Sequence, residues 1–119
     1  MTYRNISSDR VGSSRDGSAE ERPVSRDEVL ALLRAHKPVL ERRFGIVDLA
    51  LFGSFARDSA TASSDIDILV RFDGPADWRR YFGAQFYIED LFGRSVDLVT
   101  DKALRAELRP RVEREAVHV

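Results

Sequence analysis

From residue 25 onward, short apolar runs alternate with longer stretches in which apolar residues have helical spacing. Three runs, at residues 46–52, 66–72 and 95–99, are rich in branched and other apolar residues and predict β-strands. Between and around them, apolar residues recur at helical spacing, which predicts helices. Strands that alternate with helices favour an α+β or α/β fold, in which a small mixed sheet is flanked by helices.

The first helix is predicted from Ser25, which has Glu28 three residues later in the arrangement of a capping box. Apolar residues then form one face of the helix. Pro38 lacks a backbone N–H and disfavours a continuous helix. We therefore expect a short break near residues 36–37 and a second helical segment that runs through Arg43.

A second helix is predicted from Asp77, as its N-terminal cap, to Phe92, with Gly93 as the residue that ends it. Its apolar stripe is wider than one face needs in order to cover a small sheet. Core packing accounts for part of that stripe. The surplus aromatic surface is a candidate contact for another protein, and it belongs to Trp78, Phe82 and Phe86. After the third strand, residues 101–108 predict a helical turn or two, and residues 111–116 a last helix that starts from Pro110.

The first 23 residues differ from the rest of the chain. They are rich in Ser, Arg, Asp and Gly and show neither helical nor strand periodicity, which indicates a disordered extension. A basic arm is the alternative, but acidic residues are interleaved with its arginines. We therefore expect an unstructured segment over residues 1–23 and one domain over residues 24–119.

Composition narrows the class of protein. The chain has 119 residues, a net charge of −1 and no cysteine, so disulfides and thiolate metal sites are excluded. The near-neutral charge gives no broad electrostatic footprint for nucleic acid, and we expect no direct nucleic-acid binding. No apolar run is long enough to span a bilayer, and the start of the chain lacks the apolar core of a secretory signal. A cytoplasmic protein without membrane contact is expected.

Asp65 and Asp67 are the first candidate site residues. Alternation places both carboxylates on one face of the strand, opposite Ile66 and Ile68. Two carboxylates roughly 6 Å apart repel by about 3 kcal/mol at an effective dielectric near 20. A divalent cation such as Mg²⁺, which prefers carboxylate oxygens, would offset that repulsion. A solvated strand end is the alternative interpretation.

Gly53 and Ser54 follow the first predicted strand and supply a second feature of the candidate site. Glycine allows close approach of the backbone to a ligand. If a helix starts there, its free N–H groups and the Ser54 hydroxyl form a corner suited to an anion. An ordinary tight turn would explain this pair by itself. Together with Asp65 and Asp67, the pair favours metal-assisted phosphoryl or nucleotidyl transfer.

Asp97 lies in the middle of the third predicted strand, where Val96 and Leu98 face the opposite way. A carboxylate at the centre of a short apolar strand needs a partner. An ion pair with Arg57 or Arg94 would supply one.

The stretch GSFARDSATASSDIDILV resembles the GSxARG…SDIDLLV signature of the minimal nucleotidyltransferases, small members of the DNA polymerase β-like superfamily. The MntA-type antitoxins of HEPN/MNT toxin–antitoxin pairs are the most similar group. The resemblance covers about residues 25–119 and implies the minimal polymerase β-like palm. It implies that three carboxylates hold two Mg²⁺ ions and act in catalysis, namely Asp65, Asp67 and Asp97. It also implies that Gly53 and Ser54 hold the nucleotide triphosphate, with help from Arg57, for which a structural salt bridge is the alternative.

The resemblance further implies an activity. Proteins of this group transfer AMP from ATP to a tyrosine hydroxyl of a HEPN-domain RNase toxin and so silence it. About a hundred foldable residues leave no room for the substrate domains of larger relatives, so a partner is expected to complete the site. Two alternatives stay open: a non-catalytic antitoxin that acts by binding, and a nucleotidyltransferase that acts on a small molecule.

One residue departs from the signature. Asp58 stands where the motif has glycine after Arg57. If that position needs a positive φ, aspartate is one of the less penalised replacements, yet it still has a cost. It also adds negative charge beside the expected triphosphate, which would weaken nucleotide binding.

Overall fold

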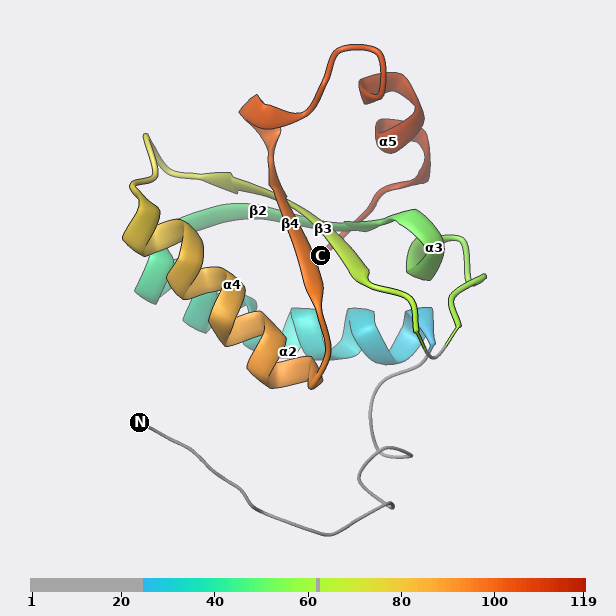
Figure 1. The fold of residues 1–119 in the computed structure, drawn as a ribbon. Helices are drawn as coiled ribbons and strands as arrows, with labels where there is room; N and C mark the ends of the chain where they lie inside the picture. Colours follow the sequence, from blue (N-terminus) through green and yellow to red (C-terminus); the bar gives the residue numbers. More distant parts are fainter. Residues whose placement is uncertain (1–24, 62) are drawn as a thin grey trace, which may run out of the picture.

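The computed structural model describes residues 25–61 and 63–119 (Figure 1). The extension predicted for residues 1–23 lies outside these ranges. The described elements are, in chain order, α2 (Arg26–Phe44), β2 (Ile46–Phe52), α3 (Gly53–Ala56), β3 (Ile66–Phe72), α4 (Trp78–Phe92), β4 (Val96–Thr100), the 3₁₀ helix η2 (Asp101–Ala103), α5 (Arg109–Glu115) and β5 (Val117–His118). The three predicted strands are confirmed, the third displaced by one residue.

The four strands form one mixed sheet in the order β4-β3-β2-β5. β2 is antiparallel to both β3 and β5, whereas β3 and β4 are parallel. Helices α2 and α4 cover one face of this sheet, and α5 lies on the opposite side (Figure 1). This arrangement is the α+β fold that the sequence predicts. No helix in the described ranges is long and apolar enough to cross a membrane.

Alternation along β3 separates the core from the site. Ile66, Ile68 and Val70 are fully buried, and they belong to the same cluster of buried residues as Leu33 of α2 and Ile88 of α4. The residues between them belong to the other face of the sheet, because successive side chains on a strand point to opposite sides. Burial of apolar surface on one face therefore fixes which carboxylates the other face presents.

Helix α2 corrects one prediction, because it continues without a break from Arg26 to Phe44 and contains Pro38. Pro38 and Arg34, whose carbonyl loses its usual hydrogen bond, are both exposed, so that carbonyl remains open to water. Buried residues on both sides of the proline, including Leu33 and Leu40, hold the two halves on the same core. The capping box at Ser25 is present as predicted.

Helix α4 matches its prediction closely. Asp77 accepts a hydrogen bond from the backbone of Arg80 as the N-terminal cap, and Gly93 ends the helix with φ 67°. Three aromatic side chains of α4 remain largely exposed, with 66% of Trp78, 44% of Phe82 and 65% of Phe86 accessible. The rings of Phe82 and Phe86 stack on each other, with centroids 6.3 Å apart.

The C-terminal region differs from its prediction in two ways. After η2, residues 104–108 form turns rather than further helix, and α5 begins one residue earlier than expected. The short strand β5 is not predicted by the sequence. It pairs Val117 with Leu51 and His118 with Ala50 of β2. Two residues are too few to show strand periodicity, so only the tertiary pairing with β2 identifies this strand.

Candidate active site

Two of the predicted carboxylates face each other across the parallel pair of strands. Asp67 of β3 is the register partner of Asp97 of β4. Asp65 lies just before β3, two residues before Asp67. Asp67 is partly buried, whereas Asp65 and Asp97 are exposed. The fold therefore brings all three predicted acids to one end of the β3–β4 pair.

The electrostatics of this end are centred on Asp67. Burial, together with the nearby charges of Asp97, Asp65 and Glu115, raises its pKa to about 6, while the charge of Arg57 acts in the opposite direction. The dominant cause is desolvation of the carboxylate, followed by repulsion from like charges. A bound cation would favour the ionised form and relieve both effects.

The three acids have no cationic partner in the described part of the chain, because no ion pair or hydrogen bond joins their side chains to another described residue. The alternative ion pair between Asp97 and Arg94 is not formed. Instead, Arg94 donates to the carbonyl of Ser64 at 3.2 Å and lies over the ring of Phe55. As the side chains stand, no cluster of three His, Cys or acidic residues within residues 25–61 and 63–119 forms a ready metal site.

Gly53 links this acidic end to the bend after β2. Its φ of 76° lies in the left-handed region, which disfavours residues with a side chain. A Cβ placed on Gly53 would lie only 2.1 Å from Oδ2 of Asp67. The carboxylate of Asp67 therefore packs directly against the glycine backbone. Both the conformation and the close approach require glycine at this position.

Ser54 lies in the four-residue helix α3, which begins at Gly53. Its carbonyl accepts hydrogen bonds from the backbone and, at 3.4 Å, from the hydroxyl of Ser59. Its own hydroxyl has no hydrogen-bond partner among the described residues, so it is free to donate to a ligand. Asp58 follows with φ 60°, which confirms that the position normally held by glycine in the signature has a positive φ here.

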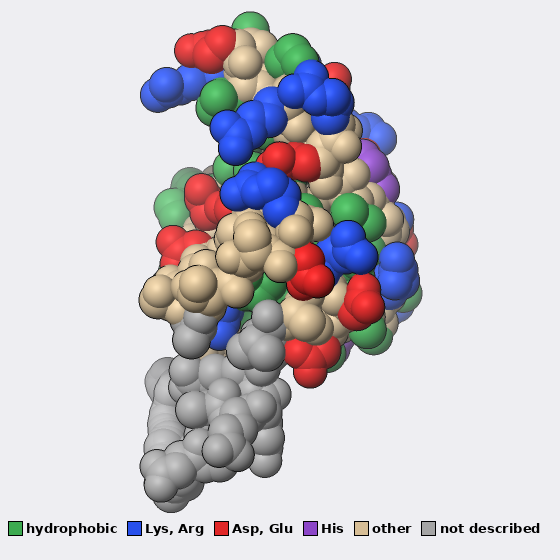
Figure 2. All heavy atoms as spheres, turned by 90° about the vertical axis from the view of Figure 1, so that its right-hand side faces the viewer, with side chains coloured by type: hydrophobic (Ala, Val, Ile, Leu, Met, Phe, Trp, Pro, Cys, Tyr) green, Lys and Arg blue, Asp and Glu red, His purple; other side chains and the backbone are tan. Residues whose placement is uncertain are grey.

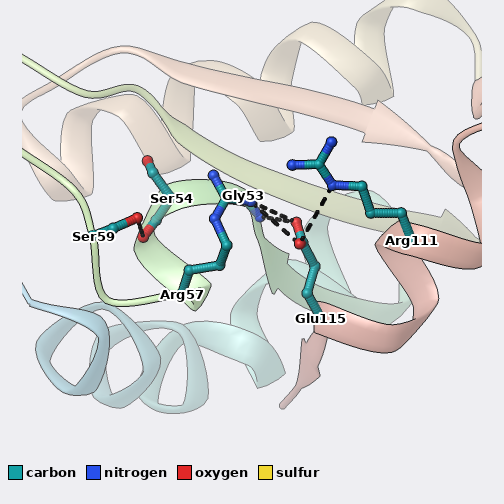
Figure 3. A network of polar contacts seen from close by, with 6 residues as sticks. All are labelled: Gly53, Ser54, Arg57, Ser59, Arg111 and Glu115. Atoms are coloured by element: carbon teal, nitrogen blue, oxygen red, sulfur yellow. Dashed lines mark hydrogen bonds and ion pairs between the residues drawn. The ribbon is translucent and has the colours of Figure 1, made fainter.

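Glu115 is a site residue that the sequence analysis missed. Its carboxylate accepts the N–H of Gly53 at 3.0 Å and pairs with Arg57 at 3.1 Å (Figure 3). Arg57 thus makes the structural salt bridge that was the alternative to a role in phosphate binding. Glu115 is 62 residues from Gly53, and the sequence analysis assigns it no role. Only the placement of α5 beside the bend reveals this contact.

The surface around this region carries charges of both signs. Figure 2 shows basic and acidic side chains interspersed on the face that Figure 1 presents at its right-hand side. The site itself is more acidic, because the charges of Asp97, Asp65 and Glu115 act on Asp67 against that of Arg57. Such an excess of acid next to the Gly53 bend is suited to a ligand that brings cations with it.

Comparisons with known proteins identify the family of this chain. The model of the nucleotidyltransferase domain family matches residues 33–118. Over 93 residues the chain is 38% identical to the protein adenylyltransferase MntA of Thermococcus cleftensis, and the match covers 78% of this chain and 94% of that protein.

Two solved structures show the same fold. One is a toxin–antitoxin complex with AMP-PNP, at 22% identity and a TM-score of 0.57, which covers 78% of this chain and 70% of the other. The second is a tri-AMPylated HEPN toxin of Shewanella oneidensis in complex with an MNT antitoxin, at 22% identity and a TM-score of 0.50, which covers 78% of this chain and 66% of the other. The family model and the sequence identity establish that this chain belongs to the nucleotidyltransferase domain family, as a minimal nucleotidyltransferase of the MntA type.

Proposed function

We propose that this nucleotidyltransferase is an antitoxin that transfers AMP from ATP to a tyrosine hydroxyl of a cognate HEPN-domain RNase toxin and thereby neutralises it. The observation that carries the proposal is the pairing of Asp67 with Asp97 next to the Gly53 bend. The similar complexes with AMP-PNP and with a tri-AMPylated HEPN toxin support the nucleotide and the partner. The requirement for ATP favours the cytoplasm as the location.

The three carboxylates are suited to Mg²⁺. They lie at one end of two adjacent strands, and their side chains form no ion pair or hydrogen bond in the described ranges. Burial raises the pKa of Asp67, and repulsion from Asp97 and Asp65 adds to that effect. Hard cations prefer such carboxylate oxygens and keep free positions for phosphate. We therefore assign the binding of Mg²⁺, with two ions, to Asp65, Asp67 and Asp97. When bound, Mg²⁺ supplies the positive charge that offsets the triphosphate and the acids together.

The remaining groups hold the nucleotide and the acceptor. The free hydroxyl of Ser54 donates to a phosphate oxygen, and Gly53 lets the bend pack directly against the carboxylate of Asp67. Arg57, whose Nη1 is held by Glu115, offers its remaining guanidinium N–H groups to the same phosphates. Asp97 is exposed and orients or deprotonates the attacking hydroxyl. The acceptor oxygen then bonds to the α-phosphorus, the bond to the bridging oxygen breaks, and pyrophosphate leaves.

The acceptor is proposed to be a protein because α4 exposes three aromatic side chains beside the strand that carries Asp97. Trp78, Phe82 and Phe86 are each 44% exposed or more. Aromatic residues of this kind are enriched at the centres of protein interfaces. Tyr81 of the same helix donates a hydrogen bond to the carbonyl of Leu98, which joins α4 to β4. A toxin bound on α4 would therefore lie beside β4, the strand that carries Asp97.

The direct test incubates the purified protein with its partner, Mg²⁺ and ATP labelled in the α-phosphate. We expect label on the partner, and loss of labelling with Asp67→Asn and with Asp97→Asn. A partner protein in which the acceptor tyrosine is replaced by phenylalanine should also remain unlabelled. If the variants still label the partner, the assigned carboxylates are wrong.

Two other outcomes would replace the proposal. If Asp65→Asn, Asp67→Asn and Asp97→Asn all protect cells from the toxin as well as the wild type does, neutralisation depends on binding alone. If label appears on a small molecule in the absence of any protein partner, the acceptor is a metabolite or a drug. Protection assays and acceptor screens therefore separate the three functions.

A further inference from the structure

The carboxylate of Glu115 joins the last helix to the bend of the site. Glu115 ends α5, and its side chain is only 18% exposed. One oxygen accepts the N–H of Gly53 at 3.0 Å, and the two oxygens lie 3.1 and 3.2 Å from Nη1 of Arg57. Nε of Arg111 lies 3.9 Å away on the other side (Figure 3). The carboxylate is thus held by the backbone and by two arginines.

Arg57 is held through one of its guanidinium nitrogens. Its hydrogen bonds go to the carboxylate of Glu115. Nη1 is engaged, whereas Nε and Nη2 have no partner among the described residues. A guanidinium presents its donors in a planar fork that suits phosphate. Arg57 is therefore anchored through one nitrogen while the remaining donors are free.

We propose that Glu115 is a positioning residue of the nucleotidyltransferase site. It fixes Arg57 beside Gly53, with the free guanidinium donors available to a nucleotide phosphate. The identity of the ligand rests on the proposed function. The contact itself rests on the hydrogen bonds of this chain.

Two other roles for Glu115 predict different effects of its removal on nucleotide binding. If Glu115 merely occupied the donors that a phosphate needs, its removal would strengthen nucleotide binding. If it served only to anchor α5, its removal would lower stability and leave nucleotide binding unchanged. Nucleotide affinity therefore distinguishes positioning from both alternatives.

The first experiment measures the Kd of AMP-PNP with Mg²⁺ by calorimetry for wild type, Glu115→Gln and Glu115→Asp. Loss of the charge-assisted contact predicts about tenfold weaker binding for Glu115→Gln, with partial recovery in Glu115→Asp, which keeps the charge. The matched control is Glu113→Gln, on the same helix, whose side chain is 60% exposed and pairs with Arg109. We expect this control to match the wild type. Unchanged or tighter binding by Glu115→Gln would overturn the proposal.

The second experiment asks whether Glu115 acts through Arg57. In an Arg57→Ala background, Glu115→Gln should cause no further loss of AMP-PNP affinity. A loss as large as in the wild-type background would overturn the proposal, because Glu115 would then act independently of Arg57.

A nucleotide-free measurement separates this inference from the proposed function. A double-mutant cycle of Arg57→Ala and Glu115→Ala, followed by urea unfolding, should show coupling of about fivefold in the unfolding equilibrium. Absence of coupling would overturn the positioning role. A wild-type protein that binds no AMP-PNP would instead contradict the proposed function, and the urea cycle would still decide the role of Glu115.

Discussion

At the scale of single residues, the site contains a carboxylate whose burial lowers the stability of the folded protein. The pKa of Asp67 rises from its ordinary value of 3.8 to about 6, mainly because the carboxylate is desolvated. The folded protein therefore holds this proton more tightly than the unfolded chain does. Stability falls as the pH rises from about 4 to 6 and stays lower above that range. We expect the function of the site to require a carboxylate at Asp67, although a neutral side chain there would make the protein more stable.

Asp67→Asn should accordingly stabilise the metal-free protein while it abolishes AMP transfer. At pH 7 we expect a gain of about 1 kcal/mol in the free energy of unfolding, a modest figure because a partly exposed charge is screened by solvent. The gain should shrink near pH 4, where the wild-type carboxyl is protonated in the folded state. Urea unfolding at the two pH values measures it, with the exposed Asp90→Asn on α4 as control. A less stable Asp67→Asn protein at pH 7 would contradict this account.

Asp58→Gly tests the departure from the family signature. The φ of 60° favours glycine, but glycine also has more freedom to lose on folding, so stability should change by less than about 0.5 kcal/mol. Removal of the negative charge should tighten AMP-PNP binding by about threefold, equivalent to about 0.65 kcal/mol. Asp58→Asn, which removes the charge but keeps the side chain, should give a similar gain in calorimetry. Weaker binding by both variants would show that Asp58 contributes to the site.

At the scale of the elements, burial decides where regular structure persists. Helix α2 crosses Pro38 because apolar residues on both sides of the proline pack on the core. The outer edge of β4 is protected in a similar way, since side chains of α4 bond its backbone. Tyr81 and Gln85 donate to the carbonyls of Leu98 and Val96, and Glu89 accepts the N–H of Val96. Unpaired strand edges invite association, and these contacts occupy that edge.

Pro38→Ala should stabilise α2. The variant restores the backbone hydrogen bond to Arg34, and the gain is reduced because proline also restricts the unfolded chain. We expect a net increase of about 2 kcal/mol in the free energy of unfolding, measured by thermal or urea denaturation. Arg34→Ala, another exposed change on the same helix, should alter stability by less than about 0.5 kcal/mol. A destabilised Pro38→Ala protein would show that the helix is adapted to the proline.

At the scale of the whole molecule, the site joins segments that are far apart along the described chain. The bend after β2, the acids of β3 and β4, and the end of α5 meet beside one another. The C-terminal residues are fixed by β5 on β2 and by Lys37, whose ammonium donates to the carbonyl of Val119 at 2.7 Å. The exposed aromatic side of α4 then remains as a surface that the fold itself does not use.

Phe86→Glu should separate partner binding from the site. Because Phe86 is already 65% exposed, the change should leave the melting temperature and AMP-PNP affinity unaltered. Loss of this aromatic side chain, which a bound toxin would bury, should weaken the toxin complex by about 30-fold, equivalent to about 2 kcal/mol. Leu108→Glu, at a similarly apolar residue that is 43% exposed, is the control and should bind normally. Normal binding by Phe86→Glu would place the toxin on another surface.

The sequence by itself determined the three main strands, the caps of α2 and α4, and the motif that carries Gly53 and Asp67. These features are local, since periodicity, capping and a short signature are read within a dozen residues. Tertiary structure decided that Pro38 would not break α2, that β5 would form, and that Glu115 would bind the Gly53 bend. Each of these depends on packing between distant segments. No pattern along the chain encodes a contact across 62 residues, whereas the folded sheet and helices bring its two ends within hydrogen-bonding distance.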